Sequence, residues 1–361
     1  MRDLIKVYQN TIIKQSYKKP VSKKKKWIIL AKTGLSAYDA FQGYDITTWE
    51  GEIATFPSDV EYVYATDIAY FKGKYYIATF SNYLLVSSDM VNWTTVSLPD
   101  SVSTGNKSIA ASDKYLGIVC GTNFIYSTDG ETFAVATAPT SLSNSIKLST
   151  YSTSFATGAL AYSPVYDCFF AAYSKATKIN IDTAGNVSFE QSKKNDTVYT
   201  HRIDASSENI YLTQQASRAT NVYNANGFEE WGTASGTRPY YSVSNFNVEK
   251  LAASLGKDNA CIGLGRERTG DWSLRYLFNT YKNKSNRYTQ GSWTSNDNAP
   301  EYNPPLCIAD WDGVDTVIFL NSYSNLRVLS MTDIITDKDF KPYRSIMSGT
   351  DLIKIKCLEI D

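Results

Sequence analysis

Two stretches of the chain repeat one small pattern, and this repeat restricts the fold more than any other feature. Residues 87–93, "SSDMVNW", and residues 127–133, "STDGETF", each carry a hydroxyl residue, an Asp two positions later and an aromatic four positions after the Asp. Each lies among four short alternating runs separated by tight turns, which predicts a four-stranded antiparallel meander. The runs are 67–71, 75–80, 83–87 and 93–98, and then 107–112, 115–120, 124–127 and 132–137.

Four strands in about 40 to 50 residues, repeated along a chain, is the interval of a β-propeller blade. Weaker copies, in which a cluster of turn residues leads to an aromatic, extend the series. The 27 Tyr residues also suit short strands. We therefore expect an all-β protein, a propeller of four-stranded antiparallel blades. The count is seven, with six or eight open because two intervals are long. The aromatic anchors are Trp49, Trp93, Phe133, Phe189, Trp231, Trp293 and Phe340.

The repeated pattern resembles the Asp-box of the bacterial neuraminidase repeat, found on sialidase-like and related propellers, whose usual form is S-x-D-x-G-x-T-W. The second copy follows a version one residue shorter, and the first follows it without the glycine. In that family the box is a structural hairpin away from the active-site end, so the resemblance implies a fold and not an activity. The matching residues are Ser127, Asp129, Gly130, Thr132 and Phe133, and Ser87, Asp89 and Trp93.

The chemistry of the pattern supports a role as scaffolding. An Asp side chain can accept hydrogen bonds from turn N–H groups that have no ladder partner. Gly130 can adopt a positive φ without a Cβ penalty, and the aromatic can pack beneath the hairpin against the neighbouring blade. The alternative is a calcium or catalytic role for Asp89 or Asp129, which would require several convergent oxygen ligands.

Charge, cysteine and histidine content argue against several classes of function. Lys plus Arg and Asp plus Glu are each 36, so no long-range field draws the whole chain to nucleic acid, membrane or acidic substrates. The five Cys residues lie far apart without a C-x-x-C pair, which argues against a disulfide framework and a zinc knuckle. His201 is the single histidine, so centres with two or three His ligands are excluded. We expect no metal site and no cofactor.

A catalytic set is not recognisable either. A sialidase needs three arginines converging on a carboxylate, and the first three expected blades contain no arginine. The separation of two glycosidase carboxylates is invisible in a sequence. The candidates Asp67, Asp204, Glu229 and Glu230 are interpreted as turn or surface acids. We expect that the protein is not an enzyme, with a glycan-active hydrolase of the sialidase-like or glycosidase class as the alternative.

A possible binding surface lies in two segments rich in Tyr and Asn, 237–247 and 275–293. Their aromatic side chains can stack on sugars or anchor a protein interface. Ordinary tyrosine-rich strands are an equal alternative. The candidate residues are Tyr240, Tyr241, Tyr281 and Tyr288.

The two ends of the chain have distinct patterns. Residues 1–26 form a basic N-terminal arm, and residues 27–361 form the propeller. The tail at 348–361 alternates apolar and charged residues, so we expect it to pair with the blade that opens at Trp27 and to close the ring. We expect the arm to dock on a protein, with nucleic-acid contact as the alternative. The apolar residues of the docking arm are Leu4, Ile5, Val7, Ile12 and Ile13.

A neutral propeller with an N-terminal arm resembles a phage virion component of the tail, the collar or the head. The expected function is that of a non-enzymatic structural or receptor/glycan-binding propeller. The expected partners are other subunits of the assembly and a cell-surface glycan, without a membrane and without nucleic acid. No signal peptide is visible, so we expect synthesis in the cytoplasm followed by incorporation into a virion.

Overall fold

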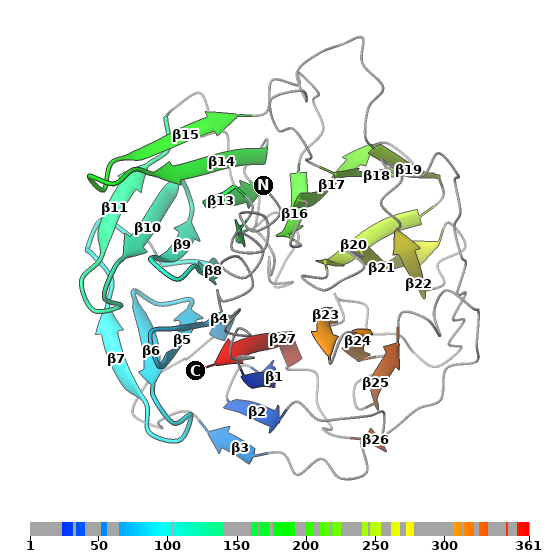
Figure 1. Cartoon of the computed structure of the whole chain (residues 1–361), viewed down its shortest axis with the longest axis horizontal. Helices are drawn as coiled ribbons and strands as arrows, with labels where there is room; N and C mark the ends of the chain where they lie inside the picture. Colours follow the sequence, from blue (N-terminus) through cyan, green and yellow to red (C-terminus); the bar gives the residue numbers. More distant parts are fainter. Residues whose placement is uncertain are drawn as a thin grey trace, which may run out of the picture.

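The described strands form seven antiparallel sheets around a common centre in the computed structural model of the chain (Figure 1). The structure describes residues 65–139 except 103, residues 160–191 except 165 and 173–175, and elsewhere the strands by their backbone pairing. These described residues form strands and turns and no helix, hence none that could cross a membrane. All paired strands are antiparallel.

The sheets follow one another along the chain, each a meander of neighbouring strands. Within each sheet, the strands are named from the centre outward. The first sheet consists of β27 (Leu352–Ile360), β1 (Lys24–Ala31), β2 (Gly34–Asp39) and β3 (Glu52–Thr55), and the second of β4 (Ala65–Phe71), β5 (Lys74–Thr79), β6 (Tyr83–Ser87) and β7 (Thr94–Ser97). The third sheet consists of β8 (Lys107–Ala111), β9 (Leu116–Cys120), β10 (Asn123–Ser127) and β11 (Ala134–Thr137), and the fourth of β12 (Leu160–Ser163), β13 (Cys168–Ala172), β14 (Ala176–Ile181) and β15 (Val187–Gln191).

The other three sheets continue the same plan, and the sixth has three described strands. They are β16 (Thr200–Ala205), β17 (Ile210–Ala216), β18 (Ala219–Asn224) and β19 (Tyr240–Ser244); β20 (Phe246–Ala253), β21 (Cys261–Glu267) and β22 (Trp272–Leu277); and β23 (Leu306–Trp311), β24 (Val314–Leu320), β25 (Asn325–Ser330) and β26 (Arg344–Ser345).

The innermost strands form a closed ring. Strand β27 contacts β4, β4 contacts β8, and the series runs through β12, β16, β20 and β23 back to β27. Four-stranded sheets repeated radially in this way are the blades of a β-propeller. The expected fold class is therefore confirmed, and the described strands make seven blades.

The first blade joins the two ends of the described chain. Strand β27 is its innermost strand and pairs with β1, with Trp27 opposite Cys357. The tail thus pairs where its alternation predicted. Strand β1 begins at Lys24, inside the segment 1–26 that was expected to be an arm, because pairing with Ile360 carries the strand into the lysine run. The arm residues 1–23, including the five apolar docking candidates, lie outside the described residues.

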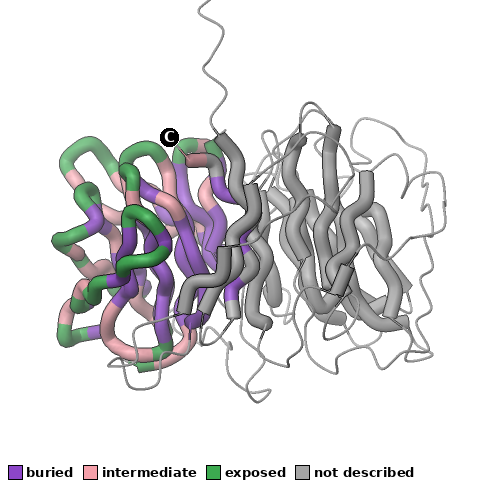
Figure 2. Tube along the Cα trace, turned by 90° about the horizontal axis from the view of Figure 1, so that it is seen from below, coloured by how far each residue is buried: buried purple, intermediate pink, exposed green. Residues whose placement is uncertain are grey.

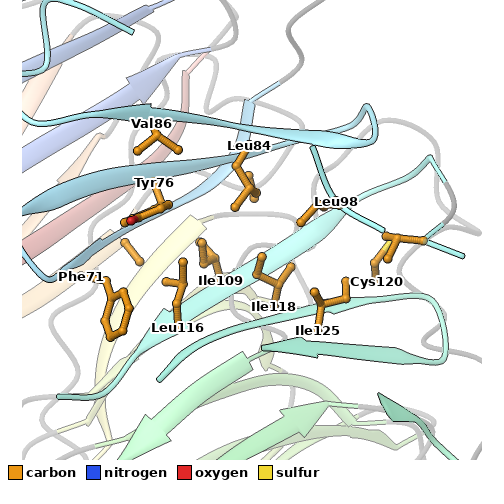
Figure 3. Close-up of a cluster of buried hydrophobic side chains, with 13 residues drawn as sticks. Phe71, Tyr76, Leu84, Val86, Leu98, Ile109, Leu116, Ile118, Cys120 and Ile125 are labelled. Atoms are coloured by element: carbon orange, nitrogen blue, oxygen red, sulfur yellow. The ribbon is translucent and has the colours of Figure 1, made fainter. Parts of the chain in front are cut away.

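The described core lies between neighbouring blades. One cluster joins the first and second blades, another joins the second and third, and a third joins the third and fourth. Figure 3 shows the second of these, in which side chains from β5 and β6 face side chains from β9 and β10. Each fully buried aliphatic or aromatic side chain in such a cluster contributes about 1.5–3 kcal/mol.

Burial falls from the centre of the ring outward. Strand β9 is buried at every position, whereas the outermost strands β7 and β11 are half-buried or exposed throughout. In Figure 2 the buried residues run along the inner strands and the exposed ones gather in the turns. The inner strands of a blade pack on both faces, so their sequences are nearly continuous apolar runs. The outer strands contain more Thr and Ser.

Candidate functional site

The turn between β6 and β7 contains the first copy of the repeated pattern. Ser87 Oγ donates to Asp89 Oδ1 (2.9 Å) and accepts from Met90 N (2.8 Å). Asp89 Oδ1 also accepts from the backbone N–H groups of Val91 (2.8 Å) and Asn92 (2.7 Å), and Oδ2 accepts from Asn92 Nδ2 (2.7 Å). The backbone and side-chain donors of Asn92 hold the pKa of Asp89 well below its usual range. The carboxylate organises the turn.

The turn between β10 and β11 has the same circuit. Ser127 Oγ donates to Asp129 Oδ1 (2.9 Å) and accepts from Gly130 N (2.7 Å). Asp129 Oδ1 accepts from the N–H groups of Glu131 (2.8 Å) and Thr132 (2.7 Å). These donors, with Thr132 the largest contributor, likewise keep the pKa of Asp129 far below its usual range. We call the two structures the hydroxyl–Asp turns.

The aromatic residues that follow these turns differ in burial. Trp93 is 9% exposed and packs in the cluster between the first and second blades, and its Nε1 donates to Met90 O (2.9 Å). Phe133 is partly buried against the cluster between the second and third blades. At the weaker copy in the fourth blade, Asp182 accepts from Asn186 N (2.8 Å), but Phe189 lies within β15 and does not precede it.

The position of Asp67 contradicts one sequence-based interpretation. It was expected in a turn or on the surface, but it is 0% exposed within β4. Its Oδ1 accepts from Ile68 N (2.8 Å), and its Oδ2 accepts from Ser108 Oγ (2.9 Å) and Ile109 N (3.0 Å) of the next blade. A buried carboxylate requires such donors, and here they fasten β4 to β8. Asp204 lies in β16, opposite Tyr211, whereas Glu229 and Glu230 lie outside the described residues.

Successive turns of an antiparallel meander lie at opposite ends of the ring, so each end carries its own set of turns. The hairpin end carries the β4–β5, β8–β9 and β12–β13 turns and the hydroxyl–Asp turns. The linker end carries the β5–β6 and β9–β10 turns and the linker 98–106 between β7 and β8.

The hairpin end is braced from blade to blade by lysines. Lys72 Nζ donates to Thr128 O (2.7 Å), and Lys74 Nζ lies 3.0 Å from Glu131 Oε1. Both contacts join the second blade to the hydroxyl–Asp turn of the third.

A polar trio continues this bracing to the fourth blade. Lys114 Nζ and Tyr162 Oη each lie 2.8 Å from a carboxylate oxygen of Asp167. The hydrogen bond raises the pKa of Lys114 and, together with that of Tyr162, lowers the pKa of Asp167. Burial, followed by the contact with Asp167, raises the pKa of Tyr162. These three side chains are thus engaged with one another across the third and fourth blades.

The linker end is organised around a buried cation. Lys107 is 1% exposed, and its Nζ donates to the backbone carbonyl oxygens of Thr79 (3.0 Å), Phe80 (3.3 Å), Ser81 (2.8 Å) and Gly105 (3.2 Å). We call this arrangement the Lys107 cage. Burial lowers the pKa of Lys107, while the four carbonyl dipoles favour its charged form.

Phe80 is displayed on the turn that the cage holds. Its side chain is 43% exposed, whereas its carbonyl oxygen accepts from Gly105 N (2.8 Å) as well as from Lys107 Nζ. Val91, 65% exposed, is the corresponding large apolar side chain at the hairpin end. The linker end therefore presents an aromatic side chain on a braced backbone.

The sequence-based binding candidates are distributed as follows. Tyr240 and Tyr241 lie in β19, the outermost strand of the fifth blade, described by its backbone alone. Tyr281 and Tyr288 lie outside the described residues. The sequence analysis missed Lys107, although a lysine opening an otherwise apolar inner strand was a usable signal.

Cysteine and metal chemistry add no further candidate among the described residues. Cys120 and Cys168 lie buried in the core and form no disulfide, and burial raises the pKa of Cys168 to about 12. No group of His, Cys, Asp and Glu side chains there could hold a metal ion.

Comparison with solved structures agrees with the fold. The chain is similar to the Dos1 propeller, with a TM-score of 0.53 and 10% identity over 91% of this chain and 86% of that one. It is also similar to the WD40 domain of Pan2 from Neurospora crassa, with a TM-score of 0.52 and 9% identity over 82% and 84% of the two chains. No protein-family model matches the chain, and no curated protein matches its sequence. At such low identity the likeness shows the propeller fold alone.

Proposed function

We propose that the protein is a non-enzymatic binding propeller that contacts its partner through the linker end. The observation that carries this proposal is the structural use of three acidic side chains among the described residues. Asp67, Asp89 and Asp129 each accept several hydrogen bonds that hold a turn or join two blades. A general acid must carry a proton near neutral pH, whereas the donors around Asp89 and Asp129 keep the pKa of both far below that range.

The linker end is the better binding surface of the two. Binding through a side chain on a braced backbone loses less conformational entropy than binding through a loose loop. Aromatic side chains are frequent interface anchors, and Phe80 meets both conditions. At the hairpin end, Lys72, Lys74 and Lys114 are already paired with groups of the next blade.

Within this binding role we assign the protein to a phage virion, joined to the assembly through residues 1–23 and presenting the linker end to a protein or glycan receptor. The Asp-box resemblance of the two hydroxyl–Asp turns supports the sialidase-like class of propeller, because both turns form the same hydrogen bonds. The basic, partly apolar arm supports docking.

A hydrolysis assay separates this function from the glycan-active hydrolase. The full chain is incubated with 4-methylumbelliferyl glycosides, including an α-sialoside and neutral β-glycosides. We expect no fluorophore release above buffer. Release that co-elutes with the purified, folded chain would overturn the proposal.

A particle assay tests the location of the two surfaces. Particles are produced with chains that lack residues 1–16, and incorporation is measured by immunoblot. We expect loss of incorporation, with Lys18→Ser/Lys19→Ser as a control that lies outside β1 and should incorporate normally. Adsorption of particles to host cells should fall in Phe80→Ala and stay unchanged in Val91→Ala. Normal incorporation of the truncated chain would refute docking through the arm. Equal adsorption of Phe80→Ala and wild-type particles would refute binding through the linker end.

A further inference from the structure

The Lys107 cage is unusual because a cation is buried without an anionic partner among the described residues. Taking an ammonium group out of water costs several kcal/mol unless other groups replace its hydration. Here the replacement is made by backbone oxygens alone, at 2.8–3.3 Å from Nζ. Three N–H donors meet four acceptors, so one donor is shared.

The cage is assembled from two segments that are distant in the chain. Three consecutive carbonyl oxygens come from the end of β5 and the β5–β6 turn, and the fourth comes from Gly105 in the linker. Gly105 has a φ of 153°, which glycine adopts without a Cβ penalty. The backbone is therefore shaped to direct oxygens at one point. A ring of carbonyl oxygens that replaces a hydration shell is also how proteins bind monovalent cations.

We propose that these four carbonyl oxygens constitute a binding site for a primary ammonium ion, and that the chain occupies this site with its own Lys107. The tethered cation ties the β5–β6 turn to the linker and so holds the backbone on which Phe80 is displayed. The site goes beyond the binding role proposed above and does not depend on it. Removing the lysine side chain empties the site but leaves its oxygens in the backbone.

A rescue experiment tests this directly. Lys107→Ala removes Cγ, Cδ, Cε and Nζ, which together have the shape of n-propylammonium. We expect the variant to melt well below the wild type. Its melting temperature should then rise with the logarithm of propylammonium concentration, as expected for a ligand that binds only the folded state.

Three controls isolate the ammonium group. n-Propanol has the same chain without the charge, and tetramethylammonium has the charge without N–H donors, so neither should raise the melting temperature. Lys107→Met fills the channel of the lysine stem, so it should melt low and stay low in propylammonium. Equal gains with propanol, or equal gains in the wild type, would overturn the proposal.

A measurement on the wild type keeps the proposal testable if Lys107→Ala does not fold. A hydrogen-bonded, buried ammonium exchanges its protons slowly with water. We expect a ¹⁵N–¹H correlation from a lysine NH₃⁺ group near neutral pH. This signal should be absent from the spectrum of Lys107→Met. If that variant also fails to fold, the signal should be absent from a wild-type sample with unlabelled lysine. A wild-type spectrum without any such signal at low temperature would refute the cage.

Discussion

The two hydroxyl–Asp turns share the hydrogen bonds between their hydroxyl, their Asp and the turn backbone, but they differ in the residue at their fourth position. In the first turn Met90 takes a φ of 64° and its side chain is 3% exposed in the cluster between the first and second blades. In the second turn Gly130 takes a φ of 79°, and a Cβ built there would collide with the hydroxyl of Tyr76 from the preceding blade. One backbone conformation thus carries a large side chain in one blade and none in the next.

The difference follows from the neighbouring blade. Strands β1 and β5 hold the same second place in the first and second blades. Ile28 of β1 packs in the same cluster as Met90, whereas the larger Tyr76 of β5 lies directly against Gly130. A smaller neighbour leaves room for Met90, and a larger one requires Gly130. The hydrogen bonds of the turn are local, but its fourth residue is selected by the volume that the adjacent blade leaves.

The largest expected effect concerns the aromatic that follows each turn. Trp93→Ala should lower the free energy of unfolding by about 3–5 kcal/mol, the range for emptying a buried large aromatic. Phe133→Ala should lower it by about 2 kcal/mol because Phe133 is only partly buried. Denaturant unfolding measures both. Trp93→Phe is the control, since it keeps an aromatic ring but loses the Nε1 bond to Met90 O and part of the indole volume, so it should cost less than Trp93→Ala. Equal losses of unfolding free energy in Trp93→Ala and Phe133→Ala would contradict the difference in burial between the two side chains.

An exchange at the fourth position should have the next largest effect. Gly130→Met should cost about 2–5 kcal/mol, from about 1–2 for a side chain at positive φ and about 1–3 for overpacking against Tyr76. The double variant Tyr76→Ile/Gly130→Met reproduces the residue sizes of the first turn. It should therefore lose less than the sum of the two single variants, with a coupling of about 0.5–3 kcal/mol. Strict additivity would show that the adjacent blade does not select this residue.

The smallest effect is the response to acid. The folded pKa of Asp89 and of Asp129 is lowered, so their stabilisation is present above the ordinary aspartate pKa of about 4 and is lost as pH falls below it. Asp89→Asn should have a lower melting temperature than the wild type at pH 7, and this difference in melting temperature should become smaller below pH 4. The gap should be wider for Asp89→Asn than for Asp129→Asn, because Asn92 Nδ2 adds a bond at the first turn. A gap that does not change with pH would show that the charge of the carboxylate is not needed.

Much of the fold could be predicted from the sequence, because its signals are local. The runs at 67–71 and 107–112 fall on β4 and β8, and the alternating tail falls on β27. Strand periodicity and turn residues require no knowledge of distant contacts. The same holds for the hydroxyl–Asp turns, whose donors and acceptors lie within a few residues of each other.

The amino-acid sequence by itself predicted the meanders and the residues that form the turns, but it left the number of blades open between six, seven and eight. Only the tertiary structure decided which polar residues are buried and what they hold. The sequence predicts Asp67 to be a turn or surface acid, but Ser108, 41 residues away, donates a hydrogen bond to it. The sequence places Lys107 at the start of a strand, and only the structure shows that the carbonyl oxygen of Thr79, 28 residues away, accepts from its ammonium group. Both depend on the close approach of two separate chain segments, because burying a charged side chain is tolerable only where distant donors or acceptors replace its water.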